Sequence, residues 1–185
     1  MEQDMTFNAH LSVWSAIIIG LAIVKLIQGI LWMIHGRKRI KIYWVHLAWV
    51  VFTIIVGTVH YWRIGLMPDV RVTDNFVVLT DILLAPLLLY LIAGLLFPRS
   101  SEDGPVDLKD YYYENRAWIF GTWVVTLLPV IVQEVIHFHL AWVYVSVPVL
   151  GTLMVTRNQW YHMAMVIVVV LSSLAIILTG FLTSY

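Results

Sequence analysis

Long runs of apolar residues, separated by short polar breaks, make up most of the chain from residue 12 onward. A helix needs roughly 20 predominantly apolar residues to cross a bilayer, and six runs meet or approach that length. Their apolar residues are continuous rather than alternating, which favours helices over the strands of a membrane barrel. We therefore expect an all-α, polytopic transmembrane helix bundle that forms a single domain, residues 1–185. The predicted spans are residues 12–34, 42–62, 76–97, 118–136, 140–156 and 159–183.

The fourth and fifth runs are separated only by a short turn around His137-Phe138-His139. Together they are too long for one straight spanning helix, so we predict six spans, with five as the alternative. The long polar stretch at residues 98–117 is expected to be a cytoplasmic loop, in which residues 107–116 form a short helix on the bilayer surface. Close helix contacts are expected at glycines within the spans, namely Gly20, Gly29, Gly57, Gly94, Gly151 and Gly180.

The composition agrees with this pattern. Of the 185 residues, 61% are hydrophobic and only 12% are charged, whereas a soluble domain is about 25% charged. The lipid bilayer is therefore the expected partner of most of the surface, together with a homo-oligomer or a partner membrane protein. The formal net charge is zero, which gives a nucleic-acid partner no electrostatic support. The absence of cysteine excludes disulfides and thiolate catalysis.

Lysine and arginine are distributed unevenly over the predicted loops, and this bias sets the orientation of a membrane protein. With the basic loop Arg37-Lys38-Arg39-Ile40-Lys41 in the cytoplasm, eight of the 11 basic residues lie on that side and two lie outside. We therefore predict that both termini lie outside. Aromatic residues near the span ends are expected to form interfacial belts, and these are Trp44, Trp62, Trp118, Trp160 and the run Tyr111-Tyr112-Tyr113.

A short motif occurs twice in the chain. His46-Leu47-Ala48-Trp49-Val50 recurs 93 positions later as His139-Leu140-Ala141-Trp142-Val143, near the starts of the second and fifth spans. Because each half then holds three spans, the two halves would have opposite orientations. Many transporters are built from such inverted repeats, with the binding site between the halves. The motif therefore suggests two inverted three-helix repeats, with a chance match as the alternative.

The segments YWVHLAW at residues 43–49 and DLKDYYYENRAW at residues 107–118 resemble those of a family of small bacterial polytopic membrane proteins. The similarity covers most of the chain. It implies a multi-pass protein of the bacterial inner (plasma) membrane. No activity is assigned to that family, so the resemblance implies no catalytic residues for this sequence.

Three charged residues (Lys, Arg, Asp or Glu) fall inside predicted spans: Lys25, Asp81 and Glu134. A charge near the bilayer centre costs about 2.5–3.5 kcal/mol, and such residues usually face the bundle interior. We expect Lys25 to pair with Asp81 if their helices adjoin, within a polar cavity that binds an ion or a small polar solute, or relays protons. The alternative is a purely structural ion pair. The predicted cavity is lined by Lys25, Gln28, Asp81, Gln133 and Glu134.

Histidines offer a second kind of chemistry. His46 and His60 lie 14 residues apart, which places them within about 40° of the same helix face. This spacing is similar to that of the axial histidines in four-helix b-type cytochromes, where a second helix repeats it. No second pair here has that spacing, so no resident cofactor is expected, and haem b is the alternative. Its candidate ligands are His46 paired with His162, and His60 paired with His137 or His139. A single metal ion is a further alternative, with Glu134, His137, His139 and His60 as ligands.

These patterns leave three hypotheses for function. The first is a small transporter or channel-like protein with a polar cavity in the outer half of the bundle. The second is a haem-binding membrane electron-transfer protein. The third is a non-catalytic accessory membrane subunit whose cytoplasmic loop docks a partner. No nucleophile–base arrangement indicates an enzyme.

Overall fold

The computed structural model of the chain describes residues 2–65, 76–98, 104–137 and 143–183. Side-chain environments are described for residues 9–62, 64, 76–98, 104–132 and 146–172. The fold is the expected all-α bundle, with a pair of two-residue strands added at one end. The elements in chain order are α1 (Glu2–His35), β1 (Ile40–Lys41), α2 (Trp44–Gly65), α3 (Phe76–Leu95), β2 (Val106–Asp107), α4 (Leu108–His137), α5 (Val143–Val155) and α6 (Gln159–Thr183).

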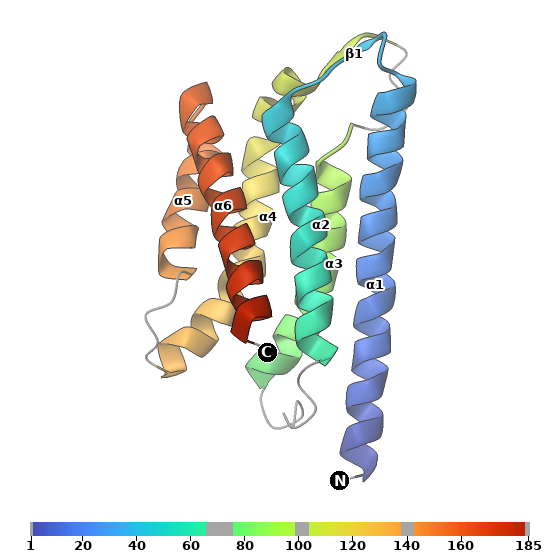
Figure 1. The fold of residues 1–185 in the computed structure, drawn as a ribbon, viewed down its shortest axis with the longest axis vertical. Coiled ribbons are helices and arrows are strands. Elements are labelled where there is room, and N and C mark those ends of the chain that lie inside the picture. The colour runs from blue at the N-terminus through green and yellow to red at the C-terminus, as the bar shows by residue number, and fades with distance from the viewer. Residues whose placement is uncertain (1, 66–75, 99–103, 138–142, 184–185) are drawn as a thin grey trace.

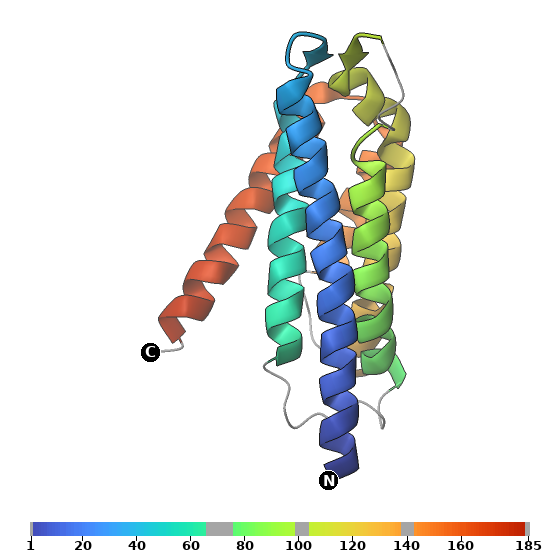
Figure 2. The same cartoon turned by 90° about the vertical axis from the view of Figure 1, so that its right-hand side faces the viewer.

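The six helices alternate in direction, so that both chain termini lie at the end of the bundle opposite β1 (Figure 1). We call the two ends the strand end and the terminus end. Helix α1 packs against α2 and α3, α4 packs against α3 and α5, and α6 contacts α2. Helix α6 leans away from the other helices toward the terminus end (Figure 2). With this alternation the triplets α1–α3 and α4–α6 have opposite orientations, as inverted repeats require. The second copy of the repeated motif lies almost entirely outside the described residues.

Among the residues whose side chains are described, four helices are long and apolar enough to cross a membrane, which makes the chain a helical membrane protein. They contain the spans Ala9–His35, Trp44–Trp62, Phe76–Leu95 and Leu108–Val132. Helices α4 and α5 are separate, as the six-span prediction requires. Helix α5 has 13 residues and therefore covers roughly 20 Å, less than the hydrocarbon core of about 30 Å. Whether α5 crosses the whole bilayer stays a prediction.

The start of α4 differs from the expected boundary by ten residues, because the helix begins at Leu108 and not at Trp118. The carboxylate of Asp107 accepts a hydrogen bond from the backbone N–H of Lys109 (2.8 Å), which caps the new helix. Leu108, Tyr112 and Ile119 then follow at helical spacing and are fully buried. The stretch predicted as a cytoplasmic loop and surface helix is therefore, from Leu108 on, the first part of a packed helix. Tyr112 is a core residue and not an interfacial anchor.

The two short strands connect the turn after α1 to the start of α4. They pair in parallel, with Ile40 opposite Val106 and Lys41 opposite Asp107. The ammonium of Lys41 donates a hydrogen bond to Asp107 (2.8 Å). This bond lowers the pKa of Asp107 and raises that of Lys41, so both groups stay charged near neutral pH. The charge of Lys41 is thus neutralised locally. The other described cations of this end are exposed or bonded to neutral groups, and they are Arg37, Lys38, Arg39, Lys109, Arg116 and Arg157.

A glycine allows one close contact between α1 and the end of α3. A methyl group placed on Gly29 would overlap the aromatic ring of Phe97, and Phe97 in turn packs edge-on against His46 (5.6 Å between ring centroids). By contrast, Gly20 on the same helix has nothing within 4 Å of that position.

We predict that Gly29→Ala destabilises the protein by about 1–3 kcal/mol, because the core has to shift around Phe97. The matched change Gly20→Ala should be neutral or stabilising, since alanine favours a helix by up to about 1 kcal/mol. Thermal unfolding in detergent measures both effects. Equal stability of the two variants would contradict the packing described.

Candidate functional site

The face of α2 that points into the bundle carries polar side chains. His46, Thr53 and His60 repeat every seven residues, close to two helical turns, and so lie along one face. His46 and Thr53 are buried and His60 is half-buried. The hydroxyl of Thr53 donates a hydrogen bond to the carbonyl of Trp49, one turn earlier (2.8 Å). The structure therefore turns the predicted histidine face inward, and the two histidines are separated by roughly 21 Å along the helix axis.

At the strand end this face meets a hydrogen-bonded histidine from α6. The Nδ1 of His162 lies 2.7 Å from the hydroxyl of Tyr112 on α4, and its Nε2 lies 3.1 Å from the carbonyl of Thr156. A carbonyl only accepts, so Nε2 carries the proton, and Nδ1 then accepts from the tyrosine hydroxyl. Both side chains are fully buried. The pair joins α4 to α6 inside the bundle.

His46 lies on the other side of this contact and differs from His162 in its hydrogen bonding. Its ring packs edge-on against Phe97 and against Tyr112 (6.2 Å between centroids). The side chain has no exposed surface, and neither ring nitrogen has a partner at hydrogen-bonding geometry within the described part of the chain. The carbonyl of Leu96, just past the end of α3, interacts with the ring without reaching that geometry.

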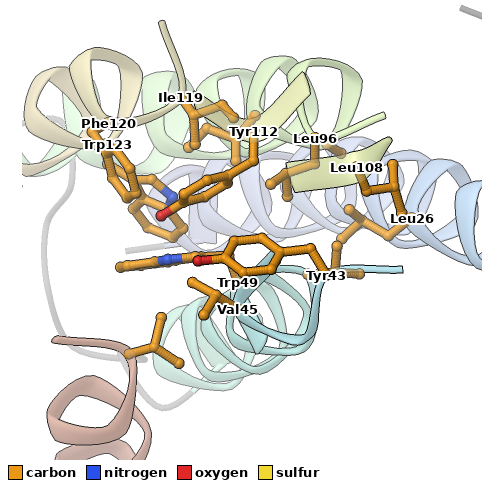
Figure 3. Close-up of a cluster of buried hydrophobic side chains, with 14 of the residues drawn as sticks. Leu26, Tyr43, Val45, Trp49, Leu96, Leu108, Tyr112, Ile119, Phe120 and Trp123 are labelled. Atoms are coloured by element: carbon orange, nitrogen blue, oxygen red, sulfur yellow. The ribbon is translucent and has the colours of Figure 1, made fainter. Parts of the chain in front are cut away.

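Two buried tryptophans complete this layer between α2 and α4 (Figure 3). Trp49 packs against Phe120 and Phe52 (4.9 and 5.5 Å between centroids), and Trp123 packs against Phe52 (5.3 Å). Neither indole N–H has an acceptor at hydrogen-bonding geometry among the described residues, although that of Trp49 interacts with the hydroxyl of Tyr112. A buried donor without an acceptor costs about 1–3 kcal/mol. We define the strand-end layer as His46, Trp49, Tyr112, Trp123 and His162.

Toward the terminus end, α1, α2 and α3 each carry a buried or half-buried polar side chain. Leu11, Ile64 and Ile82 from these helices form a small hydrophobic cluster. Polar side chains lie within one turn of its members: Ser15 and Asp81 are buried and His60 is half-buried. Asp81, at 3% exposure, has interaction partners within the structure, as does His60. We define the terminus-end layer as Ser15, His60 and Asp81.

The residues of the predicted cavity do not all meet. The amino group of Lys25 lies over the ring of Tyr90 (4.7 Å to the centroid) and beside Gly94. Asp81 precedes Tyr90 by nine residues on α3, roughly 13 Å along the axis, so the expected Lys25–Asp81 pair does not form. The reason is the register of α1 against α3, which places Gly29 opposite Phe97. Gln28 is exposed, and the side chains of Gln133 and Glu134 lie outside the described residues.

The haem hypothesis can be tested against His46 and His162. Both nitrogens of His162 are engaged by Tyr112 and Thr156, and Tyr112 contacts both imidazoles. An axial ligand needs a free ring nitrogen, so this pair does not fit a haem in the observed arrangement. The side chain of His137 and the position of His139 lie outside the described residues, as does the proposed metal site. Among the described residues, no three His, Cys, Asp or Glu side chains lie close enough together to hold a metal ion.

Sequence reasoning identified His46, His162, His60 and Asp81 but missed Trp49, Tyr112 and Trp123. A signal for the tryptophans existed, since both fall well inside predicted spans and not at their ends. Interfacial anchoring explains tryptophans at span ends, and the four named as anchors are indeed exposed: Trp44, Trp62, Trp118 and Trp160.

Comparisons with known proteins add no functional assignment. No protein-family model matches the chain, and neither the curated proteins nor the solved structures give a match. The interpretation of the site therefore depends on its own chemistry.

We predict that Tyr112→Phe lowers the free energy of unfolding by about 1–3 kcal/mol, because Nδ1 of His162 would be left buried without a donor. The matched variant Tyr61→Phe alters an exposed tyrosine on α2 and should change stability by less than about 0.5 kcal/mol. Unfolding in detergent, followed by circular dichroism, compares the two. A Tyr112→Phe variant as stable as the wild type would contradict the assigned hydrogen bond.

Proposed function

We propose that the chain is a small transporter or channel-like membrane protein that moves protons or a small polar solute through the interior of its bundle. The observation that carries this proposal is the inward face of α2, where His46 and Thr53 are buried and His60 is half-buried. This face connects the strand-end layer to the terminus-end layer. Polar side chains within membrane helices are costly, and by default they mark a pathway for ions, protons or solutes.

The polar side chains are arranged as a pathway would require. The strand-end layer places two histidines and a tyrosine hydroxyl together near one membrane surface. The terminus-end layer places a carboxylate and a serine near the other surface. Thr53 lies between the two layers, and its hydroxyl keeps lone pairs for a passing donor while its proton is bonded to Trp49.

The exposed positive charges indicate which end of the pathway would face the cytoplasm. The described cations Arg37, Lys38 and Arg39 are exposed at the strand end. Because positively charged loops stay in the cytoplasm, the strand end would face the cytoplasm and both termini would face outside. In this proposal the protein lies in a bacterial inner membrane, as the resemblance in sequence also implies.

Two threonines on α2 provide a matched test. Thr53 and Thr58 each donate to the carbonyl four residues earlier (2.8 and 2.9 Å), but Thr53 is buried whereas Thr58 is exposed toward lipid. Valine has the same shape as threonine and removes only the hydroxyl.

We predict that Thr53→Val changes the flux of protons or of a transported solute at least about fivefold in proteoliposomes, equivalent to roughly 1 kcal/mol. Thr58→Val should leave it within about twofold. The assay uses a pH-sensitive dye for protons and a panel of small polar solutes for swelling or counterflow. Wild-type vesicles that pass neither protons nor any member of the panel would overturn the proposed function.

A further inference from the structure

Several buried nitrogens of the strand-end layer have no hydrogen-bond partner at the required geometry among the described residues. An indole nitrogen can only donate, and those of Trp49 and Trp123 have no acceptor at hydrogen-bonding geometry among the described residues. The one nitrogen of His162 that accepts is already bonded to Tyr112. A ligand that satisfies the two indoles therefore has to accept hydrogen bonds. It has to be small, because the surrounding rings are almost completely buried.

The protonation state of His46 also bears on which ligand this layer can bind. A neutral imidazole has one donor and one acceptor nitrogen, whereas a protonated imidazole donates from both. The acceptor nitrogen of a neutral His46 would face no available donor at the required geometry. In the protonated form, the carbonyl of Leu96, which already interacts with the ring, would accept from one nitrogen. The other nitrogen would share an acceptor with the two indoles.

No carboxylate among the described residues is placed to balance a proton on His46. The groups packed around its ring are Phe97 and the Leu96 carbonyl beyond α3 and Tyr112 on α4, with Tyr43 and His162 contacting that tyrosine. Of the described acidic residues at this end, Asp107 is bonded to Lys41, whereas Asp110 and Glu114 are exposed. The guanidinium of Arg116 also acts on His162, and it adds positive potential. A buried charge needs a partner, and since no described carboxylate supplies one, the counter-charge in this inference is an anion from outside the chain.

We propose that the strand-end layer binds a small monovalent anion of halide size together with a proton on His46. The indole N–H groups of Trp49 and Trp123 and one N–H of the protonated His46 donate to the anion. The bound pair is electrically neutral, which removes most of the cost of burying it. This inference rests on the proposed function and names its solute class, an anion carried with a proton.

Iodide is a suitable probe because it quenches indole fluorescence on contact. We would titrate it into the full-length protein in detergent at pH 6 and pH 8, with sulfate keeping the ionic strength constant. The expected wild-type result is a saturable phase added to linear collisional quenching. This phase should be at least about tenfold tighter at pH 6 than at pH 8, where full coupling to one proton would give about a hundredfold over the two pH units. Chloride should compete it away and sulfate should not.

Two pairs of tryptophan substitutions serve as the site variant and its control. Trp49→Phe with Trp123→Phe should remove the saturable phase. Trp118→Phe with Trp160→Phe alters two exposed tryptophans (71% and 77% exposed), and should reduce only the linear phase. His46→Phe should abolish the dependence on pH. If the site variant does not fold, the test of the anion site is the wild-type titration: a saturable phase that chloride displaces supports the site, and its absence contradicts it.

Purely linear quenching at both pH values, or a saturable phase that survives in the folded site variant, would overturn the anion site and leave only a buried water there. These measurements involve no vesicles, so their outcome is separate from that of the flux assay. Flux without saturable iodide binding would contradict the anion site and leave the transport function standing. Saturable iodide binding without flux of any solute would contradict the transport function and support the anion site.

Discussion

The structure depends on one constraint: inside a bilayer, the protein itself has to satisfy its polar groups, because lipid offers no hydrogen bonds. The helices do this for the backbone, and the threonines do it for their hydroxyls. Thr53, Thr58 and Thr126 each donate to the carbonyl four residues earlier. His162 has both nitrogens paired, one with Tyr112 and one with the carbonyl of Thr156. Against this background the nitrogens of His46, Trp49 and Trp123 stand out, because none has a partner at hydrogen-bonding geometry among the described residues. They gather in one layer, and this is the physical basis for placing a ligand there.

Contacts at the strand end hold the helices that contribute to this layer in position. The pairing of Ile40 with Val106 fixes the turn after α1 against the start of α4. The ion pair between Lys41 and Asp107 lies at its edge, and the same carboxylate caps α4. These contacts place the first turns of α4 inside the bundle, where Tyr112 contacts His46 and His162. A short and mostly exposed structure at the membrane surface thus determines the position of the buried tyrosine.

Much of the fold was predictable because the bilayer imposes length and polarity on each helix. The bounds of α2, α3 and α5 agree with the predicted spans to within three residues. The start of α4 was missed because exposed polar residues, such as Asp110 and Glu114, interrupt the apolar run there. The buried residues recur only every three to four positions among them. The spacing of His46 and His60 predicted that they share one helix face, and the structure shows that this face points inward. The failure of Lys25 to reach Asp81 did not follow from the sequence, because it depends on the register between two helices. Small packing details set that register, among them the contact of Gly29 with Phe97.

The central claim is that the inward face of α2 is a polar path and its outward face contacts lipid. The chain has no native cysteine, so single cysteines placed at Thr53, which is buried, and at Val51, which is half exposed, report on the two faces at nearly the same depth. The most direct measurement is the rate at which a small water-soluble thiol reagent modifies each in intact membrane vesicles. We expect the cysteine at position 53 to react at least about tenfold faster than the one at position 51, because water reaches only the interior path. Faster reaction at position 51, or protection of both positions from the reagent, would contradict the account.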